Sequence, residues 1–185
     1  MRWAVISLKS EVTRVLLNYF FINPDQGLFV NEIARNLGLD KRNLVKKLKE
    51  LEERGLMESQ KKGTLKIYSI NKAYPLYDEY KKIILKTVGV ERELKEAFNK
   101  IKNIKEAYIF GSYSKDEMDT NSDIDVLTIG EHSIIELQRE INKIQKVIGR
   151  EINVINMSSK EYKDRVKRKE PFIQEILKQK NIRII

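Results

Sequence analysis

Residues 107–130 read Ala-Tyr-Ile-Phe-Gly-Ser-Tyr-Ser-Lys-Asp-Glu-Met-Asp-Thr-Asn-Ser-Asp-Ile-Asp-Val-Leu-Thr-Ile-Gly, and this stretch decides the fold of the second half of the chain. A short apolar run (107–110) ends in a Gly-Ser pair, and a polar, charged loop follows. A second apolar run (126–129) begins directly after Ser-Asp-Ile-Asp. Apolar runs bounded by turn residues are typical of strands. The pattern therefore predicts a strand, a tight turn, a loop and a second strand.

The polar residues between the two runs suggest a phosphate and metal site. Gly111 lets the backbone approach a ligand closely, and the hydroxyl of Ser112 with nearby amides can hold a phosphate. Asp123 and Asp125 are two residues apart on a predicted strand, so both side chains project from the same face. Two carboxylates on one face suit Mg²⁺, which is commonly held together with substrate phosphates. The stretch predicts a metal–triphosphate site for phosphoryl or nucleotidyl transfer.

The ordered combination of Gly-Ser and Asp-x-Asp resembles the signature of the DNA polymerase β-like nucleotidyltransferase superfamily. The resemblance is closest to its small branch, the minimal nucleotidyltransferases often found as antitoxin partners of HEPN-domain proteins. It implies a small mixed sheet flanked by helices, with transfer of NMP from a Mg²⁺-bound NTP to a hydroxyl acceptor. It also implies Asp123 and Asp125 as catalytic metal ligands, and as nucleotide-binding residues Gly111, Ser112, Ser114 and Lys115. The alternative is purely structural, with two surface aspartates after a glycine turn.

The chain departs from the family pattern at its third carboxylate. That residue belongs to a later strand, here in the segment 149–155, and the best register places Asn153 there. Asparagine can ligate a cation through its carbonyl oxygen, but it cannot act as a base. Glu151 lies on the same strand face and is the alternative catalytic residue. Lys115 and Asp116 also replace an Arg-Gly pair that is frequent in the branch, so whether the chain is an active nucleotidyltransferase stays open.

The composition sets limits on the class of protein. The chain has 185 residues, of which 41% are hydrophobic and 34% charged, and it has no cysteine. The absence of cysteine excludes disulfides and fits a reducing compartment. No apolar run approaches the roughly 20 residues that a membrane span needs, so we expect a cytoplasmic protein without a membrane partner.

Positive charge is concentrated in the first part of the chain. The net charge is +9, and residues 1–74 hold 14 Lys and Arg against 8 Asp and Glu. Such a basic excess points to a polyanionic partner, with nucleic acid before membrane.

The N-terminal segment shows a regular succession of helix signals. The spacing predicts a helix over 10–22 capped by Ser10, a brief helix capped by Asn31, and a longer helix over 41–54 capped by Asp40. The longest of these has a predicted buried stripe of Leu44, Val45, Leu48 and Leu51. A β-hairpin with a basic tip follows.

This order resembles a winged helix-turn-helix domain, in which the start of the longer helix meets the major groove of duplex DNA. With the apolar stripe buried, the candidate DNA-binding residues are Lys41, Arg42, Asn43, Lys46, Lys47, Lys61 and Lys62. The alternative is a winged helix used only for protein contact or dimerisation.

The sequence thus predicts an α+β protein in three segments. These are a winged helix-turn-helix domain (1–74), a helical connector (75–104) and a nucleotidyltransferase-like domain with a small mixed sheet (105–185). The leading hypothesis is a Mg²⁺-dependent nucleotidyltransferase coupled to a DNA-binding domain. The alternatives are a transcription regulator with a catalytically impaired nucleotidyltransferase fold, and an antitoxin-like partner of a HEPN-type protein. A homodimer is a further expectation.

Overall fold

A computed structural model describes residues 6–119 and 122–185 of the chain, so Thr120 and Asn121 of the loop quoted above lie outside the described residues. The chain divides into two compact units. Unit 1 consists of Met1–Arg92 with Lys146–Gly149, and unit 2 of Glu93–Gln145 with Arg150–Ile185. The segment expected to form a connector is shared between the two units.

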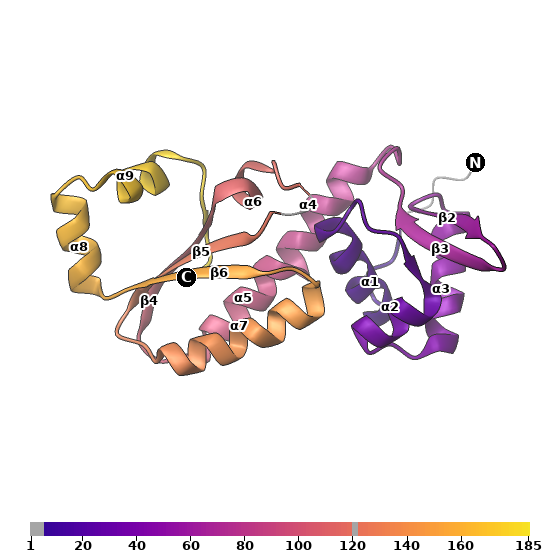
Figure 1. Cartoon of the computed structure of the whole chain (residues 1–185), viewed down its shortest axis with the longest axis horizontal. Coiled ribbons are helices and arrows are strands. Elements are labelled where there is room, and N and C mark those ends of the chain that lie inside the picture. The colour runs from indigo at the N-terminus through magenta and orange to yellow at the C-terminus, as the bar shows by residue number, and fades with distance from the viewer. Residues whose placement is uncertain (1–5, 120–121) are drawn as a thin grey trace. The chain divides into compact units, whose positions relative to one another are not determined.

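Unit 1 combines helices with a small antiparallel sheet (Figure 1). Its elements in chain order are α1 (Glu11–Ile22), β1 (Leu28–Phe29), α2 (Val30–Leu37), α3 (Lys41–Glu53), β2 (Met57–Lys62), β3 (Leu65–Ile70) and α4 (Tyr77–Thr87). The strand order is β1-β3-β2, and both neighbouring pairs are antiparallel. The predicted basic hairpin is therefore present as β2 and β3.

Side-chain caps explain where the helices of unit 1 begin. The hydroxyl of Ser10 caps α1, and the carboxylate of Asp40 accepts a 2.9 Å hydrogen bond from the backbone N–H of Asn43 at the start of α3. Both caps were predicted and are confirmed. The prediction of Asn31 as a cap is wrong, because α2 begins at Val30 and its cap residue is Phe29, two positions before Asn31. There the carboxylate of Glu32 accepts a 2.8 Å bond from the backbone of the preceding Phe29.

The apolar stripe of α3 is narrower than predicted. Leu44, Leu48 and Leu51 are fully buried, whereas 45% of Val45 is exposed. The three leucines recur at i, i+4 and i+7 and already form one complete face. Val45 lies about 100° around the helix from Leu44 and therefore falls outside that face. The expectation that Val45 is buried is thus corrected.

Unit 2 contains a mixed four-stranded sheet with the strand order β6-β5-β4-β7. Its elements are α5 (Val90–Phe98, from residue 93 onward), β4 (Ile104–Phe110), α6 (Gly111–Lys115), β5 (Ile124–Gly130), α7 (Ile134–Ile148, up to residue 145), β6 (Ile152–Met157), α8 (Ser159–Lys167), α9 (Pro171–Lys178) and β7 (Ile182–Arg183). Strand β5 is parallel to β6 and antiparallel to β4, which in turn is antiparallel to β7. The small mixed sheet expected from the sequence is confirmed.

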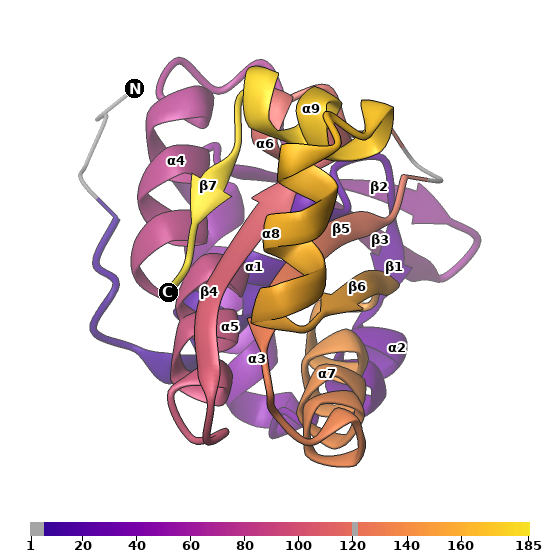
Figure 2. The same cartoon turned by 90° about the vertical axis from the view of Figure 1, so that its left-hand side faces the viewer.

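Helices cover both sides of this sheet. In Figures 1 and 2, α8 and α9 lie over one side, and α5 and α7 lie over the other. The apolar cluster on the first side contains Ile173 and Ile176 of α9 and, from the sheet, Phe110, Leu127, Ile129 and Met157. These sheet residues alternate with residues that point to the opposite face, as the two-residue period of a strand requires. None of the described helices is long and apolar enough to cross a bilayer.

Candidate functional site

The two halves of the Gly-Ser and Asp-x-Asp motif meet at one end of the sheet. Strand β4 ends at Phe110, and the antiparallel register pairs Phe110 with Asp125 of β5. Gly111 follows with φ of +71°, a left-handed conformation that favours glycine. A Cβ atom at this position would lie 2.4 Å from Oδ2 of Asp125. Glycine is therefore required here both for the backbone turn and for the close approach of the carboxylate.

The two aspartates share their end of the sheet with Asn153. The parallel register of β5 and β6 places Asn153 beside Asp125. The side-chain amide of Asn153 donates a 3.0 Å hydrogen bond to Oδ2 of Asp123. Because strand side chains alternate, the three polar side chains project from the face that carries Leu127 and Ile129 farther along. The sheet thus changes from apolar packing at one end to an oxygen-rich cluster at the other.

Partial burial affects the ionisation of Asp125 in this cluster. Desolvation raises the pKa of the Asp125 carboxyl; the amide of Asn153 opposes this shift, and the negative charge of Asp123 adds to it. A cation bound between the two carboxylates would offset their mutual repulsion and favour the ionised form of both.

The donor set fits a hard divalent cation. Among residues 6–119 and 122–185, no group of three or more His, Cys, Asp or Glu side chains is placed to share a metal ion. The third polar side chain beside Asp123 and Asp125 is an amide. Mg²⁺ is usually held by one or two carboxylates, with waters and substrate phosphates as its other ligands, so the residues present fit Mg²⁺.

The predicted nucleotide-binding residues divide into two groups. Ser112 is half-buried in the first turn of α6, and Lys115 is exposed at the end of this short helix. Ser114 is instead only 2% exposed, and its hydroxyl lies 2.8 Å from the carbonyl oxygen of Gly111 and 2.6 Å from that of Lys180. The structure therefore gives Ser114 an internal role, which ties α6 to the segment before β7.

Glu151 lies directly before β6, with an exposed side chain. Its backbone carbonyl accepts a 3.0 Å hydrogen bond from the N–H of Ile124, which places Glu151 level with Asp123 at the start of the two parallel strands. Its carboxylate is thus at the same end of the sheet as the aspartate pair.

Sequence reasoning missed Arg150. This residue is only 8% exposed, and its guanidinium Nη1 donates to the carbonyl oxygens of Asp119 (2.8 Å) and Ser122 (2.6 Å). These acceptors are about 30 positions away in the chain, so no local pattern indicates the contact. The available signal is an arginine just before a strand that carries a site residue.

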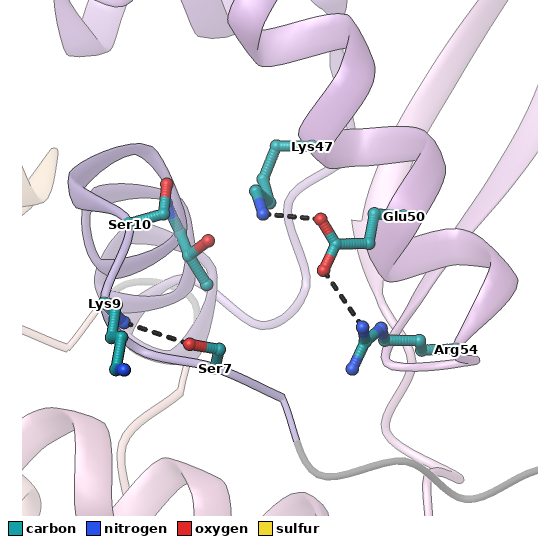
Figure 3. A network of polar contacts seen from close by, with 7 residues as sticks. Ser7, Lys9, Ser10, Lys47, Glu50 and Arg54 are labelled. Carbon is teal, nitrogen blue, oxygen red and sulfur yellow. Dashed lines mark hydrogen bonds and ion pairs between the residues drawn. The ribbon is translucent and has the colours of Figure 1, made fainter.

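The candidate DNA-binding residues of unit 1 are also not equivalent. Six of them are exposed, namely Lys41, Arg42, Asn43, Lys46, Lys61 and Lys62. Lys47 is half-buried, and its Nζ lies 2.5 Å from Oε2 of Glu50, whose other oxygen is 3.3 Å from Arg54 (Figure 3). The charge of Lys47 is therefore already compensated within α3.

Comparison with known proteins agrees with the site in unit 2. The family model described as "Nucleotidyltransferase domain" matches residues 91–182. This match spans β4, β5 and β6 of unit 2, the first residue of β7 and the aspartate pair, and it supports a nucleotidyltransferase domain of the polymerase β-like type at residues 91–182.

One curated relative is a putative protein adenylyltransferase from Methanocaldococcus jannaschii, which is 40% identical over 58 residues. The match covers 30% of this chain and 62% of that protein, so the chain spans about three fifths of its relative's length.

Three solved structures are also similar. A toxin–antitoxin complex with AMP-PNP is 15% identical, covering 51% of this chain and 72% of that chain with a TM-score of 0.38. A mutant of the toxin–antitoxin pair MntA–HpeT is 13% identical, covering 52% and 73% with a TM-score of 0.39. A putative nucleotidyltransferase from Sulfolobus solfataricus is 25% identical, covering 40% and 68% with a TM-score of 0.28.

Proposed function

We propose that the nucleotidyltransferase domain transfers a nucleoside monophosphate from an NTP to a hydroxyl acceptor in a Mg²⁺-dependent reaction. The observation that carries the proposal is the meeting of Asp123, Asp125 and Asn153 beside the Gly111-Ser112 turn. The name of the relative from M. jannaschii favours ATP as the donor and a protein hydroxyl as the acceptor.

Each residue of the cluster has a distinct part in this proposal. Asp123 and Asp125 hold the cation through carboxylate oxygens, and the amide of Asn153 contributes orientation through its bond to Asp123. Ser112 binds a phosphate oxygen next to the glycine that gives the carboxylates their close approach. When bound, Mg²⁺ neutralises phosphate charge and polarises the phosphoryl group.

Proton removal from the acceptor hydroxyl needs a base, and Asn153 cannot supply one. Glu151 is the nearest carboxylate in the strand register besides the aspartate pair, and its exposed side chain is free of the packing that holds the sheet together. We assign it the role of general base.

Calorimetric titration tests the nucleotide site directly. Wild type, the double variant Asp123→Asn/Asp125→Asn and the control Asp164→Asn on α8 are titrated with each NTP, with and without Mg²⁺. We expect Mg²⁺-dependent binding to wild type and to the control, and its loss in the double variant. Equal binding by the double variant would contradict the assignment of the aspartates.

We propose, secondly, that unit 1 is a winged helix-turn-helix domain that binds duplex DNA. The order of two helices followed by a hairpin supports it, and so does one exposed face of α3. That face holds Arg42, Val45, Lys46 and Lys49 at i, i+3, i+4 and i+7, with Lys41 and Asn43 at the helix start. Arginine and asparagine suit base edges, lysine suits phosphates, and an apolar side chain suits a thymine methyl group.

The Lys-Lys pair at the end of β2 adds a second basic element on the hairpin. A gel-shift titration with random-sequence duplex DNA tests this proposal. We expect binding that weakens steeply with salt, because released counterions dominate such affinities. Binding that does not change between Lys46→Ala and wild type would contradict the assigned face.

The same experiments separate an enzyme from a regulator. DNA binding that responds to NTP without any product formation would favour a transcription regulator with an impaired nucleotidyltransferase fold. Product formation on a protein acceptor would favour the enzyme, and a HEPN-type protein is the first acceptor to try, since the sequence resembles the antitoxin branch. Light scattering then tests the expected homodimer.

A further inference from the structure

Arg150 is a buried charged residue outside the group that the motif defines. It stands between α7 and β6, and the bonds from its Nη1 to Asp119 and Ser122 both end on backbone carbonyl oxygens. Removing a guanidinium from water is costly unless its hydrogen bonds are well satisfied. The burial of Arg150 therefore suggests that its hydrogen bonds stabilise the conformation of the loop that it contacts.

The loop end that Arg150 holds is the one from which Asp123 emerges. Ser122 and Asp119 are also bonded to each other, because the Ser122 hydroxyl donates to Oδ1 of Asp119 at 2.8 Å and accepts from its backbone N–H at 3.0 Å. Arg150 bonds the carbonyl oxygen of Ser122, and this carbonyl belongs to the peptide that joins Ser122 to Asp123. The backbone immediately before the first aspartate is thus fixed by one side chain.

The backbone immediately after Asp123 is fixed by the neighbour of Arg150. The N–H of Ile124 donates to the carbonyl oxygen of Glu151 at 3.0 Å. Asp123 is therefore flanked by two hydrogen bonds, and their partners, Arg150 and Glu151, are adjacent in the chain. In addition, the amide of Asn153 donates to the carboxylate of Asp123. Three residues among 150–153 thus determine where this aspartate lies.

We propose that Arg150 is a positioning residue, which holds the Asp123 backbone so that its carboxylate is preorganised beside Asp125 for the cation. The proposal rests on the metal site assigned above. Arginine suits this task because its planar fork has a fixed donor geometry, whereas lysine offers a compact charge on a flexible stem. Partners that orient a metal ligand typically change metal affinity by about 10–100-fold when they are removed.

The test uses the full chain and Mn²⁺ alone as the probe, with free Mn²⁺ measured by electron paramagnetic resonance. The variants are Arg150→Met, Arg150→Lys and the control Arg165→Met, which removes an arginine of α8 bonded to Glu161 and Glu170. We expect Mn²⁺ affinity to fall at least about tenfold in both Arg150 variants. The control should bind like wild type, and methylguanidinium should partly restore Arg150→Met.

A metal-free readout distinguishes positioning from general stability. In ¹⁵N-labelled protein without metal, the amide signals of Asp123 and Ile124 should move in both Arg150 variants and stay in place in the control. These spectra also show whether Arg150→Met folds, and Arg150→Lys keeps the test available if it does not.

Mn²⁺ affinity and amide signals equal to wild type in Arg150→Met would overturn the proposal. Normal affinity in Arg150→Lys would overturn it as well, because a positive charge would then suffice without the geometry of the guanidinium. If wild type bound no Mn²⁺, the proposed function would fail. The amide signals alone would then decide whether Arg150 positions Asp123.

Discussion

Replacing Gly111 by alanine is the sharpest test of how the site is built. The residue has φ of +71°, and an added Cβ would lie 2.4 Å from Oδ2, 3.4 Å from Cγ and 3.6 Å from Cβ of Asp125. The substitution therefore imposes two separate penalties. One is the left-handed backbone conformation, and the other is the collision with the carboxylate.

The two penalties have different expected sizes. A left-handed conformation costs a residue with a Cβ about 1–2 kcal/mol. Overpacking of a well-fitted site costs typically about 1–3 kcal/mol more. We therefore expect Gly111→Ala to lower the free energy of unfolding of unit 2 by more than the backbone penalty alone. Each 1 kcal/mol corresponds to a fall of roughly 4–8 °C in melting temperature for a unit of this size.

A double-mutant cycle separates the penalties. Asp125→Ala removes the two closest atoms and leaves only the Cβ at 3.6 Å, which is ordinary contact. Urea unfolding followed by circular dichroism is measured for Gly111→Ala, Asp125→Ala and the double variant. The control Gly38→Ala has φ of +63° with no atom within 4 Å, so it reports the backbone penalty in isolation.

We expect Gly111→Ala to cost more than Gly38→Ala in the wild-type background and about the same once Asp125 is alanine. The difference is the coupling energy between the two residues. Equal costs of Gly111→Ala in both backgrounds would refute the close approach of the turn to the carboxylate.

Three further predictions follow from individual contacts. Asn153→Asp adds a third carboxylate, so the melting temperature should fall without metal, because like charges repel. Mg²⁺ affinity in calorimetry should rise, and unchanged affinity would count against the position of residue 153 beside the metal-binding aspartates. Lys46→Ala should reduce the slope of log affinity for DNA against log salt by about one, whereas Lys47→Ala should change it less, since Lys47 is paired with Glu50. Burial lowers the pKa of His132 and outweighs the opposing effects of Asn156 and Glu131, so its protonation opposes folding. Stability should therefore fall as pH drops from about 6.5, the unfolded value, toward the lower folded one, and His132→Gln should flatten this dependence in thermal melts.

Local patterns predicted the parts of the site that depend on strand alternation and turn chemistry. Asp123 and Asp125 were assigned to one face because they are two residues apart, and the glycine of the Gly-Ser pair does adopt the expected turn. The strand pairing places Asn153 beside Asp125, and the sequence points to Asn153 only through the family resemblance, which assigns it to the position of the third carboxylate. The caps at Ser10 and Asp40 are signals of the same local kind.

Contacts between distant residues were not predictable in this way. The hydroxyl of Ser114 meets the carbonyl of Lys180, 66 positions later, and Arg150 reaches back about 30 positions. Neither contact has a periodic signature, because a single side chain meets a single backbone atom. The exposure of Val45 was missed for a related reason, since an apolar residue next to a leucine stripe gives no sign of which side of the boundary it occupies.

The pairing of β7 with β4 links an edge of the sheet to the candidate site. Strand β7 is only two residues long, yet it covers the outer edge of β4, where it pairs with Tyr108 and Ile109. Strand β4, with which it pairs, leads directly into Gly111. Short edge strands are the places where sheets fray and recruit foreign strands. Fraying of β7 would therefore expose the edge of the same strand that leads into Gly111 and Ser112, so the order of this edge and the shape of the turn depend on each other.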